Sequence, residues 1–201
     1  MWPPIQKIVD SVFPPSTDEL LVRSATYEAV WSRYQPTTRY GTTILLPFSD
    51  PMIRALIHQA KFHYDSRAYE LLASVLTAHL STTTHTEHWL VPVPLSRQRW
   101  HKRGYNQVTE TARRVAAEVP ASTLEPTILA RTRHTKPQTS LSRGDRLNNL
   151  SGAFRCRYQP PPAAIIILDD VCTTGSTLQA AYTACRAAYP SLPIVRLALA
   201  G

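Results

Sequence analysis

Short apolar runs and amphipathic stretches alternate along most of the chain, which is the pattern of an α/β protein. The apolar runs predict strands over residues 43–48, 89–95, 127–130, 163–168 and 194–200, with a further strand beginning at 152–154. Apolar side chains recur at helical spacing within residues 51–61, 66–80, 108–119 and 176–188, which predicts four helices. Residues 163–168 are uniformly aliphatic, as in a parallel strand covered on both faces. We therefore predict an α/β fold with a mostly parallel sheet flanked by helices.

Polar residues and prolines mark several expected boundaries of these elements. Asp50 stands before a proline and predicts a helix start, and Ser66 and Asn106 are also expected to cap helices. Because proline donates no ladder hydrogen bond, Pro92 and Pro94 exclude a central strand position with full pairing. We expect both prolines where the strand runs out into a loop.

Two stretches show a less regular spacing of apolar residues than the rest of the chain. Residues 1–42 contain one candidate helix, over 18–31, so we treat them as an N-terminal segment or hood and place the main domain at 43–201. The threonine-rich residues 81–88 predict a loop. Its two histidines, His85 and His88, have no cysteine neighbours and are expected to be incidental surface residues rather than metal ligands.

Composition narrows the class of protein. The chain has 201 residues, of which 43% are hydrophobic, enough to bury a core. A net charge of +8 suggests a polyanionic partner, whether a phosphate ester, nucleic acid or an anionic membrane surface, without choosing among them. Three cysteines without a Cys-x-x-Cys spacing exclude a disulfide framework and a zinc ribbon. With neither a secretory signal nor a long apolar run, we expect a cytoplasmic protein without membrane insertion.

The segment 165–177 carries the clearest chemistry. It reads IIILDDVCTTGST, so a buried strand delivers Asp169 and Asp170 to its carboxyl end and a hydroxyl-rich turn then opens a helix. Backbone N–H groups at a helix start bind anions, and Gly175 permits a close backbone approach. The candidate phosphate-binding residues are Thr173, Thr174, Gly175, Ser176 and Thr177.

The two acids restrict the ligand further. Carboxylates beside a phosphate seat would repel a bare phosphate, so they should meet hydroxyl donors or a cation. A ribose 5-phosphate meets this need, and Mg²⁺ could bridge nearby oxygens. The segment lacks the glycines of a nucleoside-triphosphate P-loop or a dinucleotide fingerprint. The plainer alternative is that the acids cap a helix and the threonines fill a turn.

This segment resembles the phosphoribosyl-pyrophosphate motif of type I phosphoribosyltransferases. A second set of residues, Val91–Arg97 followed by Arg99 and Arg103–Gln107, makes the chain similar to the ComF family of competence-associated phosphoribosyltransferase-like proteins. The resemblance implies a type I phosphoribosyltransferase-like domain over 43–201 and a link to DNA uptake. The family's N-terminal four-cysteine zinc ribbon is missing, because no cysteine follows Phe13-Pro14-Pro15.

The resemblance also implies roles for particular residues. Asp169 and Asp170 would be the catalytic acids that hold the ribose hydroxyls and the associated Mg²⁺. Ser96 and Arg97 would bind pyrophosphate. A flexible loop within 131–149 would add Lys136 and Arg143. Lys61 is a weaker pyrophosphate candidate, for which a surface position is the plainer interpretation.

A second function is also open. Cations interleaved with aromatic rings can bind single-stranded DNA, although rings beneath a loop also serve ordinary packing. The candidate nucleic-acid contacts are Arg99, Trp100, Lys102, Arg103 and Tyr105. The two hypotheses are therefore a phosphoribosyltransferase-like protein that binds Mg-phosphoribosyl pyrophosphate, and a single-stranded-DNA-binding competence protein whose phosphoribosyl site is a sensor or a vestige. Other DNA-uptake proteins are candidate partners in both.

Overall fold

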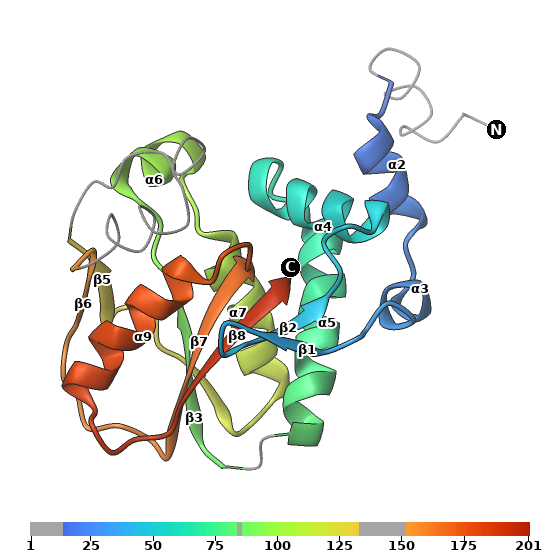
Figure 1. Ribbon diagram of the computed structural model, residues 1–201. Helices are drawn as coiled ribbons and strands as arrows, with labels where there is room; N and C mark the ends of the chain where they lie inside the picture. The colour runs from blue at the N-terminus through green and yellow to red at the C-terminus, as the bar shows by residue number, and fades with distance from the viewer. Residues whose placement is uncertain (1–13, 84–85, 133–151) are drawn as a thin grey trace.

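The computed structural model of the protein describes residues 14–83, 86–132 and 152–201, and within them it places a six-stranded, mostly parallel sheet at the centre. The strands are β1 (Thr37–Arg39), β2 (Thr42–Leu46), β3 (His88–Pro92), β4 (Ser122–Leu124), β7 (Ala164–Val171) and β8 (Ile194–Ala200), in the order β1-β2-β8-β7-β3-β4 (Figure 1). Within this six-stranded sheet of the described residues, β1–β2 is the one antiparallel pair. A separate two-stranded sheet pairs β5 (Leu129–Arg131) with β6 (Phe154–Cys156).

Helices cover both faces of this sheet, as the sequence pattern predicts (Figure 1). Helix α9 (Ser176–Ala188) packs on one face together with the small β5–β6 sheet. The other face carries α4 (Pro51–Phe62), α5 (Ser66–Thr83) and α7 (Gln107–Glu118), with α2 (Thr17–Ser24) and α3 (Tyr27–Trp31) against α4 and α5. None of the helices in the described part of the chain has the length and apolar character needed to cross a bilayer.

Strand β7 is covered on both faces, which its aliphatic sequence predicts. Ile165 and Ile167 are buried in the cluster beneath α9, whereas Ile166 and Leu168 are buried in the cluster beneath α4, α5 and α7. Successive side chains of a strand point to opposite faces, so both clusters depend on this one strand. The strand thereby holds its carboxyl end, where the two aspartates lie, in a fixed position.

Strand β3 ends at its prolines for a reason that the register shows. It pairs with β7 along its whole length, but β4 accompanies it only from His88 to Leu90. Pro92 lies beyond the last β4 pair, so its missing N–H interrupts no ladder on that side. Val93 still donates to the Leu168 carbonyl at 2.8 Å, and Pro94 follows outside the strand. The expected strand end is confirmed.

Several local predictions are wrong in detail. The single helix expected over 18–31 is two helices, because Ala25 takes an extended conformation and the Thr26 side chain caps α3. The cap of α5 is Asp65, whose Oδ1 accepts from the Ala68 N–H at 2.8 Å, while the predicted cap Ser66 is already the first helical residue. In contrast, Asp50 and Asn106 cap α4 and α7 as predicted.

The threonine-rich stretch also differs from its prediction. Helix α5 continues to Thr83, and the hydroxyl of Thr83 donates to the His79 carbonyl. His88 is a fully buried residue of β3, with its Nε2 2.7 Å from Ser122 Oγ, and is therefore no surface histidine. Its partner belongs to β4, a three-residue strand too short to recognise from sequence periodicity. His85 lies outside the described residues.

The expected boundary at residue 42 falls inside a hairpin. Tyr40 and Gly41 join β1 to β2, and both have positive φ, at 54° and 67°. Two-residue hairpin turns require this backbone, which glycine adopts at little cost. The hairpin makes residues 37–39 the edge strand of the main sheet and brings Tyr40 to the turn at the end of β7.

Candidate functional site

A cleft of about 490 Å³ opens at the carboxyl ends of β7 and β3, which are neighbours in the sheet. Its lining joins the end of β7 and the following turn to residues from α4, the β3–α6 loop, α6 (Arg97–Arg103), α7 and β5. The polar and charged residues of this lining are Lys61, Ser96, Gln98, Arg99, Gln107, Arg131, Asp169, Asp170, Thr173 and Thr177. Open parallel sheets bind ligands at this edge, so the position favours a functional cleft.

The two aspartates in this cleft have opposite electrostatic environments. Burial, and next the neighbouring Asp170 carboxylate, raise the pKa of Asp169 to about 8. Burial also disfavours ionisation of Asp170, but the Lys61 ammonium and the Gln107 amide outweigh it and lower the pKa of that carboxyl below its usual range. Asp170 is therefore already compensated by the protein, whereas Asp169 is the carboxylate that gains most from an added cation or hydroxyl donor.

A chain of polar contacts holds Asp170 in place. Its Oδ2 accepts from Gln107 Nε2 and lies 3.2 Å from Lys61 Nζ. The Gln107 Oε1 in turn accepts from Arg103 Nη1 at 3.0 Å, and the Arg103 guanidinium lies over the Phe62 ring. Lys61 is thus the ion-pair partner of Asp170 in the cleft rather than the surface lysine of the plainer interpretation. The network joins the ends of α4, α6 and β7 to the start of α7.

We expect Lys61→Met to lower the free energy of unfolding by about 1–3 kcal/mol at pH 7, because it leaves Asp170 without its cation. The pKa of Asp170 is depressed in the folded protein, so its stabilising effect exists above its unfolded pKa and fades as the pH falls. The loss should therefore shrink below about pH 4 in urea titrations. Arg113→Met, which removes a 62% exposed side chain from its ion pair with Glu110, is the control and should cost about 0.5 kcal/mol or less. An equal loss in both variants would contradict the network.

The turn after β7 leads directly into α9. Gly175 precedes the helix with φ +71°, and no side chain caps the first turn of α9. A shallow hollow at this turn is lined by 171–178 together with Asp169. The hydroxyls of Thr174 and Ser176 lie 2.9 Å apart, and Ser176 is buried. Backbone N–H groups and hydroxyls therefore converge at a helix start, which is the arrangement that binds phosphate.

The close packing at Gly175 predicts that a side chain at this position lowers stability. A Cβ there would lie 2.8 Å from the Tyr40 Cβ, in addition to the strain of a positive φ. We expect Gly175→Ala to cost more than the about 1–2 kcal/mol that the backbone conformation alone imposes. Gly104→Ala is the matched control, since Gly104 has φ +76° and open space around its Cβ position. Equal losses of stability in thermal unfolding would show that the Tyr40 contact does not constrain the turn.

Two arginines from other elements also line the cleft. Arg99 lies on α6, where the Ser96 side chain caps the helix by accepting from the Arg99 N–H. Arg131 lies on β5, where burial lowers its pKa while the Asp169 charge acts in the other direction. The cleft therefore places acids on β7 and guanidinium groups on two other elements, which suits a ligand carrying both hydroxyls and phosphates.

The residues named from the sequence are distributed over more than one place. The cleft contains the two aspartates, Ser96, and the threonines at 173 and 177, whereas Arg97 lines a different pocket on the other side of α6. Of the candidate nucleic-acid contacts, Trp100 and Tyr105 line that second pocket as well, Arg99 lines the cleft, Arg103 contacts Gln107, and Lys102 is exposed on α6. Lys136 and Arg143 lie outside the described residues.

The donor set of the cleft fits Mg²⁺ better than a transition metal. Within the described residues no three His, Cys, Asp or Glu side chains come together as a metal site. Magnesium is commonly held by one or two carboxylates plus substrate oxygens, which is the set that Asp169 and Asp170 could supply. The residues therefore fit an ion that arrives with a phosphorylated ligand. When bound, Mg²⁺ would neutralise pyrophosphate charge.

Comparison with known proteins identifies relatives of this chain. It is 36% identical to the DNA utilization protein YhgH of Salmonella typhimurium over 133 residues, which cover 64% of this chain and 58% of that protein. It is 37% identical to competence protein F of Haemophilus influenzae over 92 residues, covering 44% and 40% of the two chains. Competence protein ComFC of Streptococcus pneumoniae is 30% identical over 118 residues, with 59% and 50% covered.

The matched part of the chain belongs to the ComF family. The resemblance drawn from the motifs is thereby confirmed. The alignments span roughly half of each ComF relative's length, so the activities of the whole proteins do not transfer with the match. No protein-family model matches the chain.

Three residues of the cleft were not among the site candidates predicted from the sequence. Gln107 stands directly after the helix cap Asn106 and four residues after Arg103, a spacing that places it near the preceding helix. Arg131 is the last residue of β5, and Phe48 lies two residues after β2; both strands end near the cleft. Chain order alone does not reveal that these strand ends meet, because the meeting depends on how the sheet and the β5–β6 pair are assembled.

Proposed function

We propose that this ComF protein binds the magnesium complex of 5-phosphoribosyl 1-pyrophosphate in the cleft. The observation that carries the proposal is that Asp169, Asp170, Thr173, Thr177, Arg99 and Arg131 line one cleft of about 490 Å³, and that the hollow of the turn at 173–177 adjoins it. The turn would hold the 5-phosphate, the aspartates the ribose hydroxyls, and the arginines the pyrophosphate. Each ligand group thus meets a protein group of opposite or complementary character.

The same arrangement would suit transfer from C1 of the ribose. As pyrophosphate leaves, positive charge grows on the sugar and negative charge on the departing oxygens. Arg99 and Arg131 would stabilise the departing oxygens, while the aspartates keep the sugar oriented. The type I phosphoribosyltransferase fold that this implies is part of the proposal.

A link to DNA uptake is the second part of the proposal. It is supported by the names of the ComF relatives, one of which is called a DNA utilization protein and two of which are called competence proteins. The surplus of 22 Lys and Arg over 14 Asp and Glu is compatible with an anionic partner of this kind.

Calorimetry tests the binding proposal directly. Titrating phosphoribosyl pyrophosphate into the protein with Mg²⁺ should give saturable heat, and removing Mg²⁺ should weaken binding about tenfold or more. Ribose 5-phosphate should bind more weakly than the full ligand, because it lacks the groups that face Arg99 and Arg131. Release of pyrophosphate on adding candidate acceptor bases would then test transfer. Saturating ligand that produces neither heat nor thermal stabilisation would refute the proposal.

A further inference from the structure

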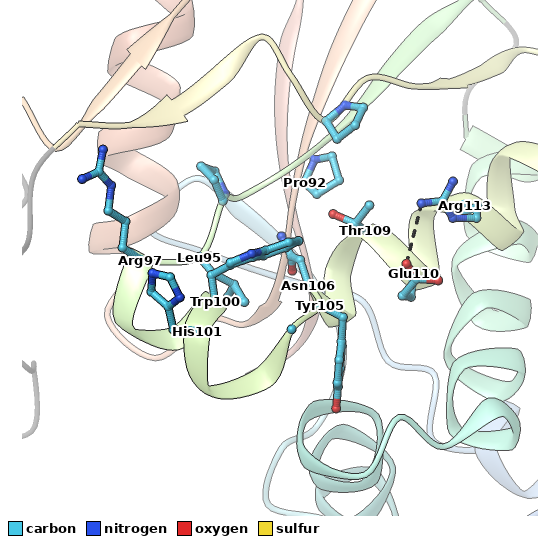
Figure 2. Close-up of a pocket in the computed structure, with 13 residues that line it drawn as sticks. Pro92, Leu95, Arg97, Trp100, His101, Tyr105, Asn106, Thr109, Glu110 and Arg113 are labelled. Carbon is cyan, nitrogen blue, oxygen red and sulfur yellow. Dashed lines mark ion pairs between the residues drawn. The ribbon is translucent and has the colours of Figure 1, made fainter.

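A second pocket, of about 480 Å³, lies against α6 and is drawn in Figure 2; the residues of α6 that line it differ from those that line the cleft. It is bounded by α6, the start of α7, the end of β3 and Pro126 in the segment after β4. Its lining shares only Pro94 and Leu95 with that of the cleft. The pocket and the cleft are therefore separate sites that meet at the β3–α6 connection.

Helix α6 presents a different chemistry to each site. Arg97, Trp100 and His101 recur at helical spacing and line the second pocket. Arg99 lies on the other side in the cleft, and Arg103, four residues on, contacts Gln107. A helix whose two faces line separate sites allows each site to be tested by substitutions that leave the other untouched.

The second pocket combines apolar walls with a cationic end. Pro92, Pro94 and Pro126 form walls that donate no hydrogen bonds, and the Trp100 side chain is 51% exposed beside them. Figure 2 shows Trp100 extending from α6 into the space between Arg97 and His101 at one end and Thr109 at the other. A flat ring could therefore contact the indole and the prolines while an attached anion reaches Arg97.

The acid in this pocket is already engaged. Glu110 forms an ion pair with Arg113 at 3.6 Å and accepts a hydrogen bond from the Tyr64 hydroxyl at 3.3 Å. Its charge is therefore compensated within the protein and does not oppose an anion at the Arg97 end. Tyr105, the other ring of the lining, is held by packing edge-on to Tyr64 with centroids 4.8 Å apart. Trp100 is the ring that is available to a ligand.

We propose that this second pocket binds a nucleobase that carries a phosphate, as a nucleotide of single-stranded nucleic acid presents it. Trp100 stacks on the base, the prolines exclude water from it, and Arg97 with His101 binds the phosphate. The basic neighbours on α6 and the net charge of +8 favour a polyanion over an apolar peptide. The proposal stands apart from that for the cleft, because different residues carry it.

The test compares a thymidine dodecamer with an abasic strand of the same length and charge, using fluorescence anisotropy at two salt concentrations. The dodecamer should bind about tenfold more tightly than the abasic strand, because base stacking is lost without the ring. Trp100→Ala should make the affinities for the two strands equal. The loss of affinity for the dodecamer that it causes should be the same at both salt concentrations. Arg97→Ala should weaken binding of both strands and reduce the salt dependence by about one counterion.

Matched controls separate the pocket from general charge and from misfolding. Lys102→Ala removes a cation from the same helix without touching the pocket lining and should leave the preference for the base intact. Tyr158→Ala removes a ring that is 70% exposed and distant in sequence from the pocket, and it should leave the affinities for both strands unchanged. Trp100→Phe should restore most of the preference. Asp169→Asn changes the cleft and not the pocket lining, so it should leave oligonucleotide binding unchanged. The two proposals can therefore fail independently of each other.

Thymidine monophosphate in calorimetry distinguishes the source of the nucleotide. If the dodecamer binds much more tightly than the monophosphate, the pocket is a site for a strand. If the two bind equally and both depend on Trp100, the pocket is a site for a free nucleotide. Either result supports a base site. Equal affinity for dodecamer and abasic strand, or no effect of Trp100→Ala beyond that of Tyr158→Ala, would overturn the proposal.

Discussion

Asp169→Asn should abolish binding of Mg-phosphoribosyl pyrophosphate while making the free protein more stable. The carboxylate sits in the cleft next to Asp170, and burial together with that neighbour raises its pKa to about 8. An asparagine keeps the shape and removes the repulsion, so the free protein gains what the carboxylate costs. The same change removes the charge that we propose attracts magnesium and the ribose hydroxyls.

The sign of the pH dependence follows from the raised pKa. Ionisation of Asp169 costs more in the folded than in the unfolded chain, so stability is greatest below its unfolded pKa and is lost as the pH rises toward about 8. Urea unfolding should therefore show little difference between Asp169→Asn and the natural protein near pH 4, and a gain of about 1–3 kcal/mol above pH 8.

A surface carboxylate provides the control for this experiment. Asp18 is 39% exposed and faces His58, so Asp18→Asn should change stability by about 0.5 kcal/mol or less and leave ligand binding intact. Asp169→Asn that is destabilising at every pH, or that binds the ligand as well as the natural protein, would contradict the assigned role.

Arg99→Ala should weaken binding of Mg-phosphoribosyl pyrophosphate about 10- to 100-fold, since a guanidinium–phosphate hydrogen bond contributes about 1.5–3 kcal/mol. Arg97→Ala removes the same charge two residues earlier on α6, but Arg97 lines the second pocket. It should therefore change the affinity about twofold or less at moderate salt.

This pair of variants decides between two assignments of the pyrophosphate contact. The family motif points to Arg97, whereas the cleft contains Arg99. Calorimetry on both variants with the same ligand preparation gives the answer. A larger loss in Arg97→Ala than in Arg99→Ala would return the contact to Arg97 and would mean that α6 turns differently when the ligand is bound.

The central part of the site was predictable because it is local in sequence. The aliphatic strand, the two acids, the turn and the helix follow one another within 165–188, and each has a recognisable residue pattern. The mostly parallel sheet followed from the alternation of apolar runs with amphipathic stretches. Asp50 and Asn106 could be recognised as caps, because their side chains hydrogen-bond within their own helices.

The rest depends on contacts between segments that are distant in sequence. Lys61 meets Asp170 only after α4 and β7 are assembled, so its sequence neighbours gave no sign of a buried partner. Residues 97–103 read as a basic segment, and without their helical phase Arg97 and Arg99 could not be assigned to opposite sides. The three-residue strands β1 and β4 are too short for periodicity and exist through their pairing with β2 and β3.

Amide chemical shifts of the turn test the central claim most directly. Adding Mg-phosphoribosyl pyrophosphate to ¹⁵N-labelled protein should shift the N–H resonances of Gly175, Ser176 and Thr177, and ribose 5-phosphate at higher concentration should shift the same set. Resonances of Trp100 and His101, in the second pocket, should stay in place. Unmoved turn resonances under saturating ligand, or shifts confined to the second pocket, would contradict a phosphoribosyl site at the end of β7.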